Sequence, residues 1–177
     1  ITARIRLGDL PPVLAAPGAG PAPWIGQLRS TLAGLPFDAD AALVAVEAEC
    51  RSASADECLA DAGRVLAEEP QNARALAWQG AALTRQALMA PAGERAGALA
   101  DARQTLARAI ALDPDDAAAA TVYFQSFVKA GEPAPERAMM GLARIAAYAP
   151  AAPEPRLLLG EELMRRGKTE LARRLLR

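Results

Sequence analysis

Apolar residues along most of the chain recur three or four positions apart, the spacing that places them on one face of an α-helix. The stretch SADECLADAGRVLAEEP shows this spacing, with Cys58, Ala62 and Val65 on a shared face. Ser54 stands at its start and Glu57 follows three residues later, which predicts a reciprocal capping box. The same spacing continues to the C-terminus and predicts a series of helices joined by short turns.

Proline, glycine and short polar stretches separate these helices. The predicted helices occupy residues 24–35, 38–50, 54–70, 72–89, 94–113, 115–131, 135–149, 154–167 and 168–177. We expect Asp38 or Asp40 to cap the second of them, and Asp115 or Asp116 to cap the sixth. The pattern is typical of antiparallel helix pairs with short links.

The first 23 residues differ from the rest of the chain. Residues 1–7, ITARIRL, alternate apolar and polar side chains as a short strand does, and a segment rich in Pro, Gly and Ala follows. We expect an extended arm and a linker at residues 1–23 and a helical domain at residues 24–177. Because the chain starts at Ile1 and stops within a helical pattern, we expect it to be a piece of a longer protein.

Prolines end the predicted helix pairs at nearly regular intervals. Pro36, Pro70, Pro114 and Pro150 stand 34, 44 and 36 residues apart, and each interval contains two predicted helices. A proline ring clashes with the preceding helical turn, so each of these residues ends a helix. The intervals predict repeating units at residues 37–70, 71–114, 115–150 and, in part, 151–177.

A period near 34 residues with two helices per unit resembles the tetratricopeptide repeat (TPR). That family has a small residue where the two helices cross, apolar residues beside it, and a closing proline. In the last unit the residues that match in order are Leu159, Gly160, Leu163, Gly167, Ala172 and Leu176. In the unit before Pro114 they are Gly80, Leu83, Ala102, Leu106 and Ala109. Over about residues 37–177 the resemblance implies an all-α fold, a right-handed α-solenoid of antiparallel helix pairs that follows the N-terminal arm.

Two features depart from the family pattern. Gly80 and Pro114 are 34 residues apart, about ten more than the family's usual spacing. We expect a longer first helix and a loop at residues 90–95 to accommodate this insertion. Val46 occupies the small-residue site of the unit at residues 37–70, which therefore resembles the family least. A generic array of helical hairpins is the alternative.

The resemblance also implies a concave groove, lined by the first helix of each pair, that binds a peptide or a partner helix. The groove candidates are Arg74, Trp78, Arg85, Thr121, Gln125, Lys129, Glu161 and Arg165. The basic and asparagine clamp that some family members use for a terminal carboxylate is absent from the matching sites. Each candidate also fits a solvated or packing role, and Trp78 in particular fits the core.

Composition removes several classes of function. The chain contains no histidine, which excludes Ser-His-Asp and Cys-His nucleophiles and His-ligated metals within it. PGAGPAP lacks the Lys-Ser/Thr that a phosphate-binding P-loop requires. We therefore expect no enzyme activity, no metal and no cofactor. A net charge of -1 argues against nucleic acid, and no apolar run is long enough to insert into a membrane.

Charge is distributed unevenly along the chain. Residues 37–70 contain nine acidic and two basic side chains, whereas residues 151–177 contain seven basic and four acidic ones. Such a gradient can orient a charged partner. Ordinary solvated helix faces are the alternative explanation.

The two cysteines stand at the ends of neighbouring predicted helices. Cys50 closes one helix, Cys58 begins the next, and RSASADE connects them. A helical hairpin can bring their Cα atoms within the roughly 4.4–6.8 Å that a disulfide requires. A bridge would indicate an oxidising compartment such as the bacterial periplasm. Two independent thiols in a reducing cytoplasm are the alternative.

These observations lead to three hypotheses of function. The first is a non-catalytic protein- or peptide-binding scaffold module of a larger bacterial protein; the bacterial source is inferred from abundant Ala and from Arg far outnumbering Lys. The second is a recognition or docking appendage of an exported enzyme, such as a hydrolase or peptidase, whose catalytic domain lies outside this segment. The third is a structural role in which the solenoid forms a homodimer.

Overall fold

The computed structural model describes residues 26–27, 30–31, 34, 37–52, 54–148 and 153–176. These residues are almost entirely helical, and no strand occurs among them. The helices are α2 (Ala39–Ser52), α3 (Ala55–Glu68), α4 (Ala73–Met89), α5 (Ala92–Leu112), α6 (Ala117–Val128), α7 (Glu136–Tyr148), α8 (Pro153–Arg165) and α9 (Thr169–Leu175). The predicted arm and linker, and most of the predicted helix at residues 24–35, lie outside the described residues.

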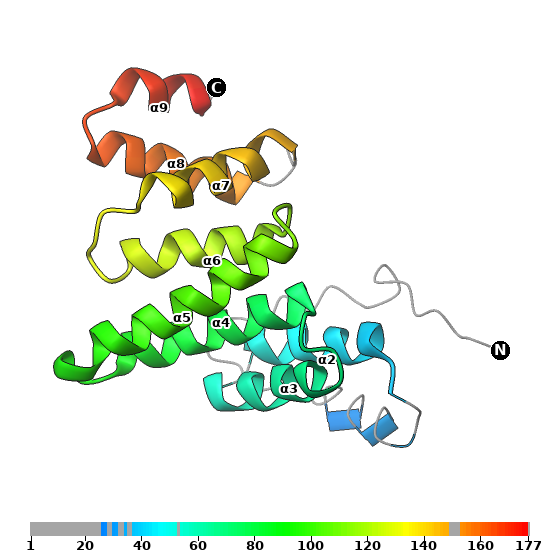
Figure 1. Cartoon of the computed structure of the whole chain (residues 1–177). Coiled ribbons are helices and arrows are strands. Elements are labelled where there is room, and N and C mark those ends of the chain that lie inside the picture. The colour runs from blue at the N-terminus through cyan, green and yellow to red at the C-terminus, as the bar shows by residue number, and fades with distance from the viewer. Residues whose placement is uncertain are drawn as a thin grey trace.

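The helices form four pairs that stack on one another, α2–α3, α4–α5, α6–α7 and α8–α9 (Figure 1). Helix α4 contacts both α2 and α6, and the second helix of each pair contacts the first helix of the next pair. Each pair completes its core against its neighbours, as in a solenoid. The all-α solenoid expected from the sequence is therefore confirmed, while the division into an arm and a helical domain stays a prediction.

Side chains at the helix starts bond the free backbone N–H groups of the first turn. Ser54 Oγ accepts from the N–H of Glu57 at 3.2 Å, and Glu57 Oε2 accepts from the N–H of Ser54 at 3.3 Å. The predicted capping box is therefore present. Of the two candidates at each of the other starts, Asp38 and Asp116 accept from the N–H three residues further on.

The prediction of a loop at residues 90–95 is wrong. Only Ala90 and Pro91 separate α4 from α5, and the inserted residues lengthen both helices, so that α5 reaches 21 residues. Pro91 stands directly before the first turn, where its lack of an N–H has little cost and its φ suits a helix start. Glu94 lies in that turn, where a negative charge is favourable. The residues assigned to the loop therefore begin α5.

Gly80 allows α4 to approach α5 closely. A Cβ atom at Gly80 would lie 2.5 Å from Cγ and 2.8 Å from Cδ2 of Leu106, and 3.3 Å from its backbone nitrogen. Leu106 is fully buried, and interiors are close-packed, so moving its side chain aside would disturb the core. Because Trp78 and Arg85 lie on either side of Gly80 in α4, this contact also determines where their side chains stand.

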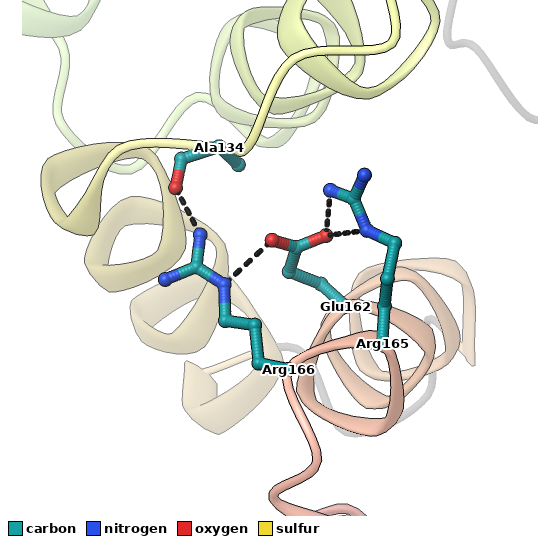
Figure 2. A network of polar contacts seen from close by, with 4 residues as sticks. All are labelled: Ala134, Glu162, Arg165 and Arg166. Atoms are coloured by element: carbon teal, nitrogen blue, oxygen red, sulfur yellow. Dashed lines mark hydrogen bonds and ion pairs between the residues drawn. The ribbon is translucent and has the colours of Figure 1, made fainter.

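Glu162 is a buried carboxylate that ties α8 to the link between α6 and α7 (Figure 2). It accepts hydrogen bonds from Nε of Arg165 at 2.8 Å and from Nε of Arg166 at 2.6 Å. Arg166 also donates to the backbone carbonyl of Ala134 in that link. Burial alone would raise the pKa of Glu162, but the hydrogen bonds and charges of the two arginines outweigh it and leave this pKa below its ordinary value.

We expect Gly80→Ala to lower the free energy of unfolding by about 1–2 kcal/mol, because the clash with Leu106 outweighs the higher helix propensity of alanine. Gly63 in α3 is the matched control, since a Cβ there would meet no atom within 4 Å. Gly63→Ala should raise the same free energy by about 0.5–1 kcal/mol. Urea denaturation measures both variants. Equal stability of the two would contradict the close crossing of α4 and α5.

We expect Glu162→Gln to lower the free energy of unfolding by about 1–3 kcal/mol at neutral pH, because it removes the charge that the two arginines bind. The folded pKa lies below the unfolded one, so the carboxylate stabilises the fold above the unfolded pKa of about 4.3. That contribution is lost as the pH falls through the folded pKa. The deficit of the variant should therefore shrink between about pH 7 and about pH 3 in denaturant titrations.

The control for this measurement is Glu161→Gln, because Glu161 is an exposed neighbour on the same helix. Glu161→Gln should change the free energy of unfolding little at about pH 7 and at about pH 3. A deficit of Glu162→Gln that is independent of pH would show that the ionised carboxylate does not stabilise the fold.

Candidate protein-binding groove

A pocket opens where α2, α4 and α6 lie side by side. Its volume is about 190 Å³, which leaves room for a single amino-acid side chain. The residues that line it are Cys50, Trp78, Ala81, Thr84, Arg85, Leu88, Val122, Gln125 and Lys129. The three helices are the first helices of their pairs, so the pocket lies on the surface expected to form the groove. Four of the eight groove candidates, Trp78, Arg85, Gln125 and Lys129, meet in it.

Trp78 forms the aromatic wall of the pocket. It is only 9% exposed and packs in the core shared by α2, α3 and α4, so it also has the packing role that the sequence left open. The guanidinium of Arg51 lies 5.9 Å from its ring centroid, within the range of a cation–π contact. The indole Nε1 is buried and has no hydrogen-bond partner among the described residues. This donor is therefore unused within the described part of the chain.

Arg85 supplies a second unused group. Its Nε and Nη2 atoms are buried, and within the described part of the chain neither has a hydrogen-bond partner. Burial lowers the pKa of Arg85, because a charge removed from water is destabilised. The guanidinium stays protonated at neutral pH nonetheless, since its ordinary pKa is above 12. Arg85 is therefore a partly desolvated positive charge, and no acidic side chain in the described part of the chain neutralises it.

Gln125 of α6 and Lys129, the residue that follows α6, also line the pocket. Gln125 donates from Nε2 to Oε1 of Glu154 at 3.3 Å, a bond that links α6 to α8. Lys129 is exposed, and it forms no ion pair with any residue that the structure describes. The lining residues therefore include two cations and no carboxylate.

The other four candidates lie elsewhere. Arg74 forms an ion pair with Glu47 of α2, with 2.5 Å between the charged atoms, and lines a wider depression near the starts of α2 and α4. Arg165 is bonded to Glu162. Thr121 is half-buried and Glu161 is exposed, and neither lines the pocket. The groove surface beyond the pocket stays a prediction.

Besides Cys50, four lining residues are not among the eight groove candidates: Ala81, Thr84, Leu88 and Val122. Leu88 stands three positions after Arg85 on α4, and Val122 stands three before Gln125 on α6. Residues three apart share a helix face, so this spacing was the signal that could have identified them.

Cys50 and Cys58 form a disulfide that joins α2 to α3, with their Cα atoms 4.7 Å apart. Both are buried in the same core as Trp78, and Cys58 Sγ lies 3.6 Å from the backbone carbonyl oxygen of Trp78. Cys50 also lines the pocket. The disulfide therefore supports the helix that carries the pocket's aromatic wall.

The described ranges contain no group of three or more His, Cys, Asp or Glu side chains arranged to hold a metal ion. In the same part of the chain, no helix has both the length and the apolar character needed to cross a membrane. What the pocket offers is therefore hydrogen-bond donors, positive charge and apolar contact.

Comparison with known proteins identifies the fold. Neither the models of protein families nor the curated proteins include a match to this chain. A search of solved structures finds a crystal structure of a thermophilic TPR protein from Thermus thermophilus, with a TM-score of 0.69 and 18% sequence identity. The match covers 85% of this chain and 77% of that one. The chain therefore has the fold of a TPR protein.

Proposed function

We propose that the chain is a non-catalytic module that binds a peptide or protein segment in the groove formed by α2, α4 and α6 and continued by α8. The observation that carries this proposal is the pocket between α2, α4 and α6, whose lining combines apolar side chains with Arg85 and Lys129 and contains no carboxylate. Arg85 is half-buried, and its Nε and Nη2 have no partner among the described residues. A bound segment would cover the apolar walls and pair the charge of Arg85.

The fold itself supports a role as a scaffold for protein interactions. A stack of helix pairs exposes a long surface built from successive first helices, and such surfaces commonly bind peptides or helices. We infer that this module belongs to a longer bacterial protein.

An exported enzyme of which this chain is the docking appendage, such as a hydrolase or peptidase, is the second candidate. The disulfide between Cys50 and Cys58 favours it, because disulfides persist in oxidising compartments such as the periplasm. The groove would have the same role, while catalysis would take place in a separate domain. Without the disulfide, a cytoplasmic location is favoured.

Selection of phage-displayed random peptides against the whole chain tests the binding role. We expect the selected peptides to lose at least tenfold in affinity on Ala81→Arg, which would fill the pocket with a long charged side chain. Ala100→Arg places the same side chain at an exposed site on α5 and should leave the affinity unchanged. Fluorescence polarisation measures both. Peptides that bind Ala81→Arg as tightly as the original chain would show that the groove is not the binding surface.

The disulfide is tested by counting thiols. We expect no alkylated cysteine in the native protein and two after reduction, as measured by mass spectrometry. Cys50→Ala/Cys58→Ala should lower the free energy of unfolding by about 2–3 kcal/mol, because an uncrosslinked unfolded chain has more conformational freedom. Under reducing conditions the original chain should lose most of this advantage. Two alkylated cysteines in unreduced protein would exclude the bridge.

A further inference from the structure

We propose that the pocket between α2, α4 and α6 receives the carboxylate of a glutamate or aspartate side chain from an acidic peptide, and that Arg85 is the residue that binds it. This inference rests on the proposed role of the groove in peptide binding and adds the chemistry of the segment that is bound.

The first argument is the state of Arg85. Arg85 is half-buried and lines the pocket, and a partly desolvated cation is ordinarily paired with a carboxylate or with carbonyl oxygens. Its Nε and Nη2 have no partner among the described residues, and no described acid forms an ion pair with it. A carboxylate is the group that a guanidinium binds most strongly, so it is the ligand that best completes this site.

The second argument is that two carboxylates on neighbouring helices, Glu47 and Glu154, are bonded elsewhere and that no carboxylate lines the pocket. Glu47 on α2 pairs with Arg51 and Arg74. Glu154 on α8 accepts from Gln125. The residues that line the pocket include no acid at all, whereas they include Lys129 as a second cation. The charge of the pocket is therefore complementary to an anionic ligand.

The third argument concerns size and polarity. The pocket volume of about 190 Å³ suits one side chain. Ala81, Leu88 and Val122 provide apolar walls that can contact the methylene groups of a glutamate. Arg85 and Lys129 supply positive charge to the same lining. This combination of apolar walls and positive charge favours a carboxylate on a short aliphatic stem.

Two defined peptide libraries test the proposal. Both consist of N-acetylated, C-amidated nonapeptides with four randomised positions on each side of a fixed central residue, which is Glu in one library and Gln in the other. The whole chain is immobilised, and mass spectrometry quantifies the retained peptides. We expect at least tenfold greater retention of the Glu library. The ratio should fall to near one for Arg85→Met.

Arg108→Met is the matched control, because Arg108 is exposed on α5 and does not line the pocket. This variant loses the same charge and should keep the original ratio. An equal fall for Arg108→Met would show that only the overall charge matters and would overturn the role of Arg85.

A third library has a free C-terminal carboxylate and a central Gln. Retention of this library at the level of the Glu library would mean that the pocket binds a chain terminus, and it would overturn the assignment to a side chain. Weak retention, similar to that of the amidated Gln library, supports it.

The thermal stability of Arg85→Met provides a readout independent of binding. Replacing an unpaired buried charge by an apolar side chain of similar length removes a desolvation penalty, so the midpoint of thermal unfolding should stay unchanged or rise. A clear fall would mean that Arg85 stabilises the fold through a bond within the chain, and it would overturn the proposal.

The outcomes separate this inference from the proposed function. The original chain could retain the Glu and Gln libraries equally, and Ala81→Arg could lose the retention of both. That outcome would support peptide binding in the groove and overturn the carboxylate preference. If no library is retained, both the groove and the carboxylate preference are wrong.

Discussion

The close crossing of α4 and α5 at Gly80 and Leu106 is the contact on which the groove depends. It leaves no room for a Cβ atom at position 80, and Leu106 is fully buried, so the two helices can approach this closely only with glycine there. Trp78 and Arg85 extend from α4 two residues before and five residues after this point. The position of the pocket wall is therefore a consequence of core packing on the other side of the same helix.

Two residues that line the pocket contain polar groups without hydrogen-bond partners among the described residues, and such groups are destabilising unless a ligand binds them. Trp78 is packed in the core, yet its indole N–H has no partner among the described residues, and Arg85 is partly desolvated without a counter-charge there. By contrast, the buried Glu162 has two arginine partners, and its pKa is lowered. The chain thus neutralises the buried Glu162 fully, whereas the half-buried Arg85 in the groove has no counter-charge within the described part.

Local spacing and the TPR-like pattern account for the features that were predicted correctly. The capping box at Ser54 follows from two side chains at a fixed spacing, and the small residue Gly80 at the helix crossing follows from the resemblance of its unit to the TPR pattern. The start of α5 was missed because the family spacing was given more weight than the helix propensity of the residues after Pro91. The ion pair of Arg165 could have been predicted from the sequence, since Glu162 lies three positions earlier on the same helix. The unpaired state of Arg85 could not have been predicted, because it depends on how neighbouring repeats stack.

The insertion that lengthens α4 and α5 has a consequence for the order in which the chain folds. These two helices are joined by only two residues and form the most extensive helix–helix contact in the described structure. Contacts between segments near in sequence require little loop-closure entropy, and in a repeat protein folding can begin at any unit and spread to its neighbours. We therefore expect the α4–α5 hairpin to form first, and α2 and α6 to complete the pocket by docking onto it.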